Sequence, residues 1–375
     1  MTTYLLAGGG TAGHVNPLLA VADALRLRDP AATVLVLGTA EGLESRLVPE
    51  RGYELLIVPR LPFPRRPNRA ALGFLPKFNR AINDVAAILR QRRVDVVVGF
   101  GGYVATPAYL AARRAGVPIA IHEANAKPGL ANRVGAALTR SVGVAFPGTR
   151  LRHARVVGMP LRREIETLDR AGSRPAGLEF FGLDSDRPVL LVTGGSLGAR
   201  RINRTIVDSA TVLSESGWQV LHITGNAAEV DDPRLPGYRM IAYCDRMDLA
   251  LSVADFAVSR AGAATVSELS ALGIPAAFVP YPVGNGEQRF NAADVVAGGG
   301  GILVDDADFL PGWIRAELLP VLAEPRRIHD MSAAALSAGV LDGTARTLEL
   351  VDEASGAAPG AEPGAAPGAT APHSA

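Results

Sequence analysis

Short apolar runs rich in β-branched residues alternate with amphipathic stretches along most of this chain. In the first half these runs are TYLLA, TVLVLG, ELLIVP, VDVVVGF, VPIAIHE and SVGVAF. A near-continuous apolar strand followed by a helical pattern is typical of a parallel sheet that helices cover on both faces. The pattern therefore predicts an α/β domain in the first half of the chain.

The alternation lapses over residues 167–187, where Gly and Pro cluster, and then resumes with PVLLVTGG, WQVLHITG, YRMIAY, ADFAVSR, IPAAFVP and GGILVDD. A chain of 375 residues is long enough for two domains of ~100–200 residues each. We predict an N-terminal domain over residues 1–161 and a C-terminal domain over residues 162–340. A last helix over residues 341–353 can pack on either domain, and we assign it to the N-terminal one.

Composition narrows the class of protein. The 38 basic and 37 acidic side chains nearly cancel, so no bulk positive field favours nucleic acid. The single Cys244 excludes an internal disulfide and suits a reducing compartment. No basic segment precedes the first strand, and prolines interrupt the longest uncharged run, residues 269–286. We therefore expect neither a signal peptide nor a membrane span. Residues 354–375, rich in Ala, Pro and Gly, are predicted to be disordered.

The first Gly-rich turn, GGGTAG at residues 8–13, follows the first strand and opens a helix. Its spacing fits the dinucleotide-binding fingerprint G-x-G-x-x-G. A dinucleotide site also needs an acid after the second strand to hold a ribose diol, but Gly38 and Thr39 occupy that place. We therefore expect the loop to hold a phosphate at a helix N-terminus without a dinucleotide. His14 and Asn16 then lie at the mouth of this helix, and simple capping is the alternative role for them.

Polar side chains follow two later strands of the first half, in the sequences GFGGY and HEAN. Because the carboxyl ends of parallel strands meet at one edge of a sheet, ligands bind there. We expect Tyr103, His122, Glu123 and Asn125 to lie on the same rim as His14. Taken together these residues favour a site over packing alone.

The second unit opens with the same arrangement of strand, Gly turn and helix, TGGSLGARR. A P-loop would need a Lys that is absent here, and Gly194, Gly195 and Ser196 offer amides and a hydroxyl instead. The D-x-D sequence at Asp184 and Asp186 precedes the first strand of this unit. That is the wrong end of the sheet for a ligand, so we interpret it as a turn with no metal role.

A further polar cluster follows later strands of the second unit. Arg260 and a run of small residues open a helix, whose N-terminus offers free N–H groups and the positive end of the helix dipole. Glu268 lies two turns inside that helix, where a carboxylate can accept two hydrogen bonds from a ribose diol. A solvated helix face is the alternative. Glu287, Gln288 and Asn291 supply groups suited to sugar hydroxyls.

Residues 55–83 contain several Arg and Lys side chains and no acidic residue. Aromatic and aliphatic side chains are interleaved with the basic ones, a combination that suits the interface of an anionic membrane. An ordinary basic loop with a few core anchors is the alternative. The membrane contacts that we predict are Phe74, Leu75, Lys77, Phe78 and Arg80.

Six motifs resemble, in order and spacing, the MurG family of bacterial peptidoglycan glycosyltransferases: GGGTAGHVNPLLAVADAL, GFGGYVATPAYLAA, HEANAKPGLANR, GGSLGARRIN, SRAGAATVSEL and GEQRFNA. The similarity spans residue 4 to about 350. It implies the GT-B fold, in which two Rossmann-like domains with parallel sheets face an interdomain cleft. It also implies metal-independent, inverting transfer of GlcNAc from UDP-GlcNAc to the C4 hydroxyl of undecaprenyl-pyrophosphoryl-MurNAc-pentapeptide (lipid I), with no cofactor.

The resemblance also carries roles onto matching residues. His14 corresponds to the family's candidate catalytic histidine, and Glu123 is our second candidate base. Four residues correspond to the acceptor's pyrophosphate site: Gly9, Gly10, Gly13 and Tyr103. Residues matched to the donor are Thr11, Asn125, Arg162, Ser196, Cys244, Arg260, Ala263, Ala264, Thr265, Glu268 and Gln288. Among them, Arg162 and the Cys244 backbone match the uracil pocket, Glu268 the ribose ligand and Gln288 the sugar ligand. The family often has two glutamines where this chain has Glu287 before Gln288.

The partners implied are UDP-GlcNAc, lipid I and an anionic inner-leaflet surface, with no nucleic acid. The implied location is peripheral, on the cytoplasmic face of the bacterial cell membrane. Another GT-B enzyme is the first alternative, either a natural-product glycosyltransferase or a UDP-GlcNAc 2-epimerase. The others are a non-catalytic binding protein for a nucleotide sugar or lipid carrier, and a Rossmann dehydrogenase.

Overall fold

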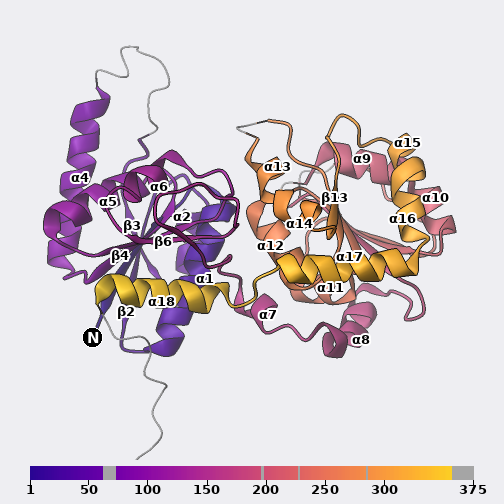
Figure 1. Ribbon diagram of the computed structural model, residues 1–375, viewed down its shortest axis with the longest axis horizontal. Coiled ribbons are helices and arrows are strands. Elements are labelled where there is room, and N and C mark those ends of the chain that lie inside the picture. The colour runs from indigo at the N-terminus through magenta and orange to yellow at the C-terminus, as the bar shows by residue number, and fades with distance from the viewer. Residues whose placement is uncertain (62–72, 196–197, 227–228, 284–285, 357–375) are drawn as a thin grey trace, which may run out of the picture.

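Two parallel sheets, each at the centre of an α/β domain, organise the computed structural model (Figure 1). The structure describes residues 1–61, 73–195, 198–226, 229–283 and 286–356. Residues 62–72 of the predicted basic segment, Ser196, and residues 357–375 of the predicted tail therefore lie outside the described residues.

The N-terminal sheet is seven-stranded, with the order β3-β2-β1-β4-β5-β6-β7. All its neighbouring strands pair in parallel. The strands are β1 (Thr3–Gly8), β2 (Thr33–Gly38), β3 (Glu54–Ile57), β4 (Val96–Gly101), β5 (Ile119–Glu123), β6 (Ser141–Val144) and β7 (Ala154–Val156). Helices of this half are α1 (Ala12–Arg28), α2 (Glu44–Glu50), α4 (Phe74–Gln91), α5 (Ala105–Ala115) and α6 (Leu130–Gly135).

The C-terminal sheet is six-stranded and also parallel, with the order β10-β9-β8-β11-β12-β13. Its strands are β8 (Val189–Thr193), β9 (Gln219–Ile223), β10 (Tyr238–Ile241), β11 (Phe256–Ser259), β12 (Ala276–Phe278) and β13 (Gly301–Leu303). The helices are α7 (Arg163–Glu166), α8 (Arg170–Phe181), α9 (Arg200–Asp208), α10 (Ala210–Glu215), α11 (Met247–Val253), α12 (Ala263–Ala271), α13 (Glu287–Asn291), α14 (Ala293–Ala297), α15 (Pro311–Trp313), α16 (Leu319–Leu322) and α17 (Pro325–Ala338), with a π-helix over Ile314–Leu318.

Alternate residues of the central strands enter different hydrophobic cores. On β1, Leu5 belongs to one buried cluster and Leu6 to the other. On β8, Leu190 and Leu191 divide in the same way. Side chains point alternately to the two faces of a sheet, so each sheet is covered on both faces. Burial of both faces explains the near-continuous apolar runs in the sequence.

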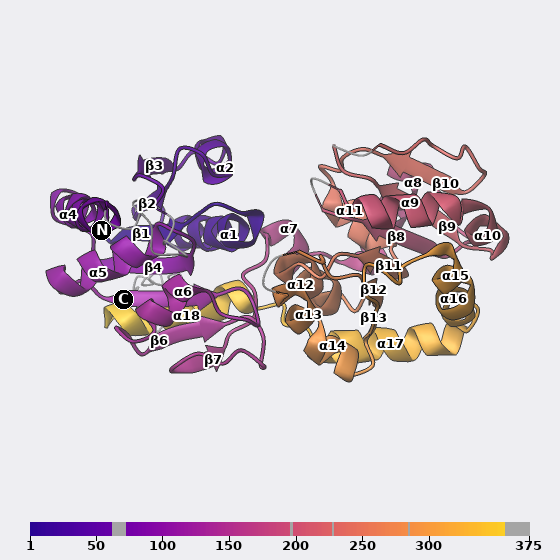
Figure 2. The same ribbon diagram turned by 90° about the horizontal axis from the view of Figure 1, so that it is seen from above.

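Helix α18 (Gly343–Ser355) follows the whole C-terminal domain in the sequence but packs on the N-terminal one. It contacts α1, β5 and β6, and Val351 is buried in an N-terminal core. The Arg28 guanidinium donates to the Asp352 carboxylate at 2.7 Å. In Figure 2 the yellow α18 lies with the N-terminal elements, and α17 lies with the C-terminal sheet.

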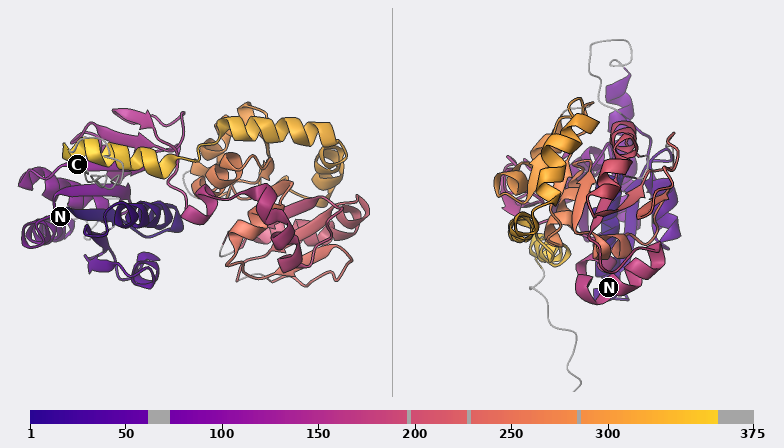
Figure 3. Two further views of the ribbon diagram at one scale, coloured as in Figure 1. Left: turned by 90° about the horizontal axis from the view of Figure 1, so that it is seen from below. Right: turned by 90° about the vertical axis from the view of Figure 1, so that its right-hand side faces the viewer.

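The two domains lie side by side along the long axis of the molecule (Figure 3). The chain passes between them before α7 and again between α17 and α18. One buried cluster continues across the junction, because Phe146 and Met159 of the first half pack with Val266 and Val295 of the second. Within the described part of the chain, no helix has the length and apolar character needed to cross a bilayer.

Candidate active site

A cavity of about 660 Å³ lies between the two domains, at the carboxyl ends of the N-terminal strands. The loops after β1, β2, β4 and β5 line one side, and the starts of α12 and α13 line the other. The cavity brings together these predicted residues: Gly9, Gly10, Thr11, Gly13, His14, Tyr103, Glu123, Asn125, Ala263 and Gln288. Side chains from both domains therefore share one cleft.

His14 lies in the first turn of α1, directly after the Gly turn. Its Nδ1 atom is 3.1 Å from the Gly9 carbonyl oxygen and 3.3 Å from the Thr11 hydroxyl. A ring that carries its proton on Nδ1 donates it to the Gly9 carbonyl, and Nε2 is then an acceptor. The ring packs against Gly101, where an added Cβ would lie 3.1 Å from Nε2. In this tautomer, Nε2 of His14 is the ring nitrogen that is able to accept a proton.

Glu123 ends β5, and its carboxylate lines the cleft but is 1% exposed. It accepts hydrogen bonds from the backbone N–H groups of Asn125 and Gly129, both at 2.9 Å. The Asn132 side chain donates to it at 3.0 Å and accepts the Tyr109 hydroxyl at 2.7 Å. Burial raises the pKa of the Tyr109 phenol well above its usual value. Both Glu123 oxygens are therefore engaged in shaping the loop after β5.

The prediction that His122 lies on the same rim is wrong. The ring is fully buried beside Phe100 and donates through Nε2 to the Gly158 carbonyl at 2.8 Å. Successive side chains of a strand point to opposite faces, so Glu123 reaches the cleft while His122 points into the domain. Burial lowers the pKa of the His122 ring to about 4.

Asn291 at the end of α13 connects the domains rather than facing open solvent. It is 1% exposed and accepts the Ala126 N–H at 2.9 Å. Its side-chain amide donates to the Asn125 side chain at 3.4 Å and to the Ala261 carbonyl at 3.3 Å. The sequence predicted a polar role for Asn291 at the site, but its contacts with Asn125 and Ala126 depend on how the two domains meet.

Arg162 and Glu268 form a second group in the C-terminal half, outside the lining of the large cavity. The Arg162 guanidinium donates to the Glu268 carboxylate at 3.3 Å. Glu268 is 15% exposed, so the alternative of a solvated helix face is wrong. Burial raises the pKa of the Glu268 carboxyl, and Arg162 opposes that shift. Cys244 is buried within range of the Arg162 charge, and burial raises the pKa of its thiol.

The Arg260 side chain is largely buried and contacts other groups of the protein. It pairs with Asp306 at 2.6 Å and donates to the carbonyls of Val279 and Pro280, both at 3.1 Å. Its guanidinium carbon is 5.5 Å from the Tyr281 ring centre. The side chain thus joins the end of β11 to the segment after β12.

Gln288 and the start of α12 form the C-terminal wall of the cleft. The Gln288 carbonyl oxygen accepts the Tyr281 N–H at 2.9 Å. Glu287 lines the same cavity. Helix α12 begins at Ala263 after an extended Gly262, so the first N–H groups of Ala263, Ala264 and Thr265 lie at the positive end of its dipole.

Glu44 is the most buried acid of the site, and no motif in the sequence marked it. Its carboxylate accepts the Gly10 N–H at 2.8 Å, the Thr39 N–H at 2.9 Å and the Thr39 hydroxyl at 2.8 Å. The Gly10 amide, predicted for the acceptor's pyrophosphate, is therefore already paired.

Comparison with known proteins identifies the family. The profile of the glycosyltransferase family 28 N-terminal domain matches residues 4–144, and that of the C-terminal domain matches residues 189–347.

A protein of Leifsonia xyli subsp. xyli named UDP-N-acetylglucosamine--N-acetylmuramyl-(pentapeptide) pyrophosphoryl-undecaprenol N-acetylglucosamine transferase is 66% identical over 351 residues, covering 94% of this chain and 98% of that protein. The protein of the same name from Streptomyces coelicolor is 52% identical over 354 residues, covering 93% and 97%. The crystal structure of Acinetobacter baumannii MurG superposes with a TM-score of 0.77 at 28% identity, covering 94% of this chain and 100% of that one.

The chain belongs to the MurG family. The predicted GT-B fold and the predicted enzyme class, a glycosyltransferase, are thereby confirmed. A Staphylococcus aureus MnaA structure with UDP matches at a TM-score of 0.66 and 13% identity, covering 94% of this chain and 96% of that one, and so shares the fold.

Asp184 and Asp186 lie in an exposed turn before β8 of this MurG-family chain, as predicted. The Asp186 N–H donates to the Asp184 carboxylate at 3.0 Å. Over the residues that the structure describes, no group of three or more His, Cys, Asp or Glu side chains is placed to hold a metal ion.

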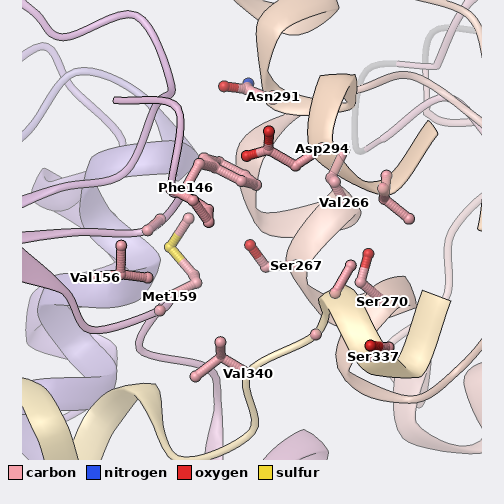
Figure 4. Close-up of a pocket in the computed structure, with 16 residues that line it drawn as sticks. Phe146, Val156, Met159, Val266, Ser267, Ser270, Asn291, Asp294, Ser337 and Val340 are labelled. Carbon is pink, nitrogen blue, oxygen red and sulfur yellow. The ribbon is translucent and has the colours of Figure 1, made fainter. Parts of the chain in front are cut away.

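A second cavity, of about 240 Å³, lies where the two MurG-family domains join. Figure 4 shows Phe146 and Met159 on its N-terminal side and the side chains of Ser267, Ser270 and Asp294 on the other. Asn291 lines both cavities. The Asn291 amide therefore lies between the large cleft and this smaller cavity at the domain junction.

Proposed function

We propose that this protein transfers GlcNAc from UDP-GlcNAc to the C4 hydroxyl of MurNAc in undecaprenyl-pyrophosphoryl-MurNAc-pentapeptide. The observation that carries the proposal is the orientation of His14 in the interdomain cleft, with Nδ1 against the Gly9 carbonyl. The names of relatives that match almost the whole chain support this choice of donor and acceptor.

In the proposed reaction the C4 hydroxyl attacks the anomeric carbon in line with the departing UDP, and the configuration inverts. His14 Nε2 takes the hydroxyl proton as the new C–O bond forms. General base catalysis of this kind contributes roughly 10²–10⁴-fold to the rate. Glu123, whose oxygens hold the loop after β5, acts as a positioning residue for Asn125.

The donor is held by the C-terminal domain in this proposal. The first N–H groups of α12 meet the charge that develops on the leaving diphosphate, without a metal ion. Glu268 accepts the ribose hydroxyls, and the Arg162 guanidinium at 3.3 Å favours its charged form. Arg260 keeps the segment after β12, and with it Gln288, against the end of β11.

A transfer assay with radiolabelled UDP-GlcNAc and a soluble lipid I analogue, with and without EDTA, tests the proposal. We expect EDTA-resistant product and a loss of about 10²–10⁴-fold in kcat for His14→Ala. Absence of product from the wild-type protein would refute the function, and release of UDP-ManNAc without acceptor would favour the epimerase alternative. Sensitivity to EDTA would refute the metal-free mechanism, and near-normal turnover of His14→Ala would refute the base.

The start of α4 carries the proposed contact with an anionic membrane surface, on the cytoplasmic face of the cell membrane. Leu75 is 65% exposed, and Lys77 and Arg80 are exposed on the same turns. Phe74 and Phe78 stack with ring centres 5.2 Å apart, and Phe78 also packs against the N-terminal core, so it anchors the helix. These turns rise above the N-terminal sheet in Figure 1.

Vesicle co-sedimentation tests this contact. Replacing both Lys77 and Arg80 with Glu reverses two charges that are each worth ~1 kcal/mol at an anionic surface. We expect the double variant to bind vesicles that contain phosphatidylglycerol more weakly than the wild type does, with equal turnover of a soluble acceptor. Equal sedimentation of both proteins would refute the contact.

A further inference from the structure

Glu44 is a fully buried carboxylate enclosed by the loops that follow β1 and β2. It lies at the start of the short helix α2, and its three hydrogen-bond donors come from Gly10 and Thr39. Burial by itself raises the pKa of such a carboxyl, but the N–H donors outweigh burial and hold the pKa of Glu44 below its usual value. The side chain therefore carries a negative charge inside the Gly turn near neutral pH.

Glycines surround this carboxylate on several sides. A Cβ added at Gly9 or Gly42 would overlap the carboxylate, and one added at Gly38 would lie 2.5 Å from Cγ of Glu44. Close approach of a ligand phosphate is the usual reason for glycine in a loop of this pattern. Here the group that needs the space at Gly9 is a side chain of the protein itself.

The same contacts determine which amides are open to a ligand. Gly10 has φ +90°, a conformation that favours glycine, and its N–H points at Glu44. A phosphate that took this N–H would displace an anion that already has three donors. The next N–H groups belong to the N-terminus of α1, where the first amides have no partner within the helix and the dipole is positive.

Glu44 is also connected to the proposed base through one peptide group, formed by the Gly9 carbonyl and the Gly10 N–H. The Gly9 carbonyl holds Nδ1 of His14 at 3.1 Å. A Cβ added at Gly102 would lie 2.7 Å from the same carbonyl oxygen. Glu44 therefore binds the N–H of this peptide group, and His14 lies against its carbonyl.

We propose that Glu44 is a positioning residue of the acceptor site, an internal anion that fixes the Gly9–Gly10 turn so that His14 is oriented and the N-terminus of α1 is left for the acceptor's pyrophosphate. This inference rests on the proposed function. It moves the pyrophosphate contacts away from the Gly10 amide and toward residues 11–13.

Steady-state kinetics of Glu44→Gln against Glu50→Gln test the proposal. Glu50 lies on the same short helix with an exposed side chain, so its variant controls for the loss of one charge. In Glu44→Gln one carboxylate oxygen becomes an NH₂ group that cannot accept an N–H. We expect kcat/KM for the lipid I analogue to fall about 10- to 100-fold, since misplaced reacting groups cost up to ~10²-fold. The KM for UDP-GlcNAc should stay within about twofold of the wild-type value, an expectation from the same geometric argument.

Two further variants keep the test decisive if Glu44→Gln folds poorly. Glu44→Asp keeps the charge and should retain more acceptor activity than the Gln variant. Thr39→Val removes one donor to Glu44 and should lower acceptor kcat/KM about threefold, in line with the modest net worth of a single hydrogen bond.

Several outcomes would overturn the proposal. In one, Glu44→Gln matches Glu50→Gln in acceptor kcat/KM. In another, the KM for the acceptor falls, which would mean that Glu44 competes with the pyrophosphate. In a third, the KM values for both substrates rise by the same factor, which would mean a structural role alone. A wild-type protein without transfer activity would instead refute the proposed function, so the two failures are distinguishable.

Discussion

The Gly turns after β1 and β8 have the same sequence pattern but use their glycines differently. In the N-terminal turn, Gly9 makes room for the buried Glu44 carboxylate. In the C-terminal turn, a Cβ at Gly198 would overlap the Thr224 carbonyl, so glycine there permits a close approach of two backbones. A Gly-rich turn after a parallel strand thus predicts the local geometry without showing which group fills the space that it leaves.

The charges near the two turns differ as well. The N-terminal turn encloses a carboxylate, whereas Arg260 and Arg201 approach Asp306 in the C-terminal domain at 2.6 Å and 3.8 Å. We infer that the first turn leaves only the end of its helix for an anion. The two domains should also differ in their stability at acid pH, in their contribution to donor binding and in the contact that requires glycine in each turn.

The largest expected effect is on stability at acid pH, where each domain contains one buried neutral histidine. Burial lowers the pKa of both His122 and His222 from 6.5 to about 4. Between these values the unfolded chain binds the proton and the native domain does not. Stability is therefore complete above pH 6.5 and falls as the pH is lowered toward 4, by up to about 3 kcal/mol for each ring.

Urea unfolding at pH 6.5 and pH 4.5 measures this effect. His122→Leu should reduce the pH dependence for the N-terminal domain, and His222→Leu should do so for the C-terminal one. His329, whose side chain is 84% exposed, supplies the control variant His329→Gln. An unchanged pH dependence in both Leu variants would contradict the prediction.

The second effect concerns the donor. Glu268→Gln removes a charged partner of Arg162 and of the proposed ribose hydroxyls. A hydrogen bond to a charged group is worth ~1.5–3 kcal/mol, so the KM for UDP-GlcNAc should rise about 10- to 100-fold with little change in the KM for the acceptor. Glu164→Gln, at an exposed carboxylate near the same guanidinium, is the matched control. Equal donor KM values for the two variants would contradict the role of Glu268.

The smallest expected effect concerns why glycine is required at positions 9 and 198. Gly9→Ala should lower the free energy of unfolding by roughly 1–3 kcal/mol, because its Cβ meets the Glu44 carboxylate. Adding Glu44→Ala should return part of that loss. In Gly198→Ala the new Cβ would meet the Thr224 backbone carbonyl, and no side-chain substitution can relieve that contact. Denaturant titration of these three variants and of Glu44→Ala alone measures the effects, and additive losses in the double variant would contradict the assigned cause.

The sequence carried enough information to predict the parallel sheets, since their strands are apolar on both faces. It also placed Tyr103, Glu123, Asn125 and His14 at strand ends that meet in the cleft. Glu44 escaped prediction because its partner Gly10 lies 34 residues away and no strand-end pattern marks it. The prediction placed His122 in the cleft because it did not consider which face of β5 each side chain occupies. Neighbouring side chains at the end of β5 point in opposite directions, so Glu123 lines the cleft and His122 lies in the core. The contact of Arg260 with Asp306 depends on folding that local pattern does not reveal.

The return of α18 to the N-terminal domain has a consequence for synthesis on the ribosome. Val351 completes a core that begins with Tyr4 and Leu6, and Asp352 pairs with Arg28. All residues of the C-terminal domain are translated between these two parts. Until α18 has been made, the apolar surface that Val351 covers in the N-terminal domain is without this partner. The N-terminal domain, although translated first, lacks part of its core until the C-terminal domain has been translated.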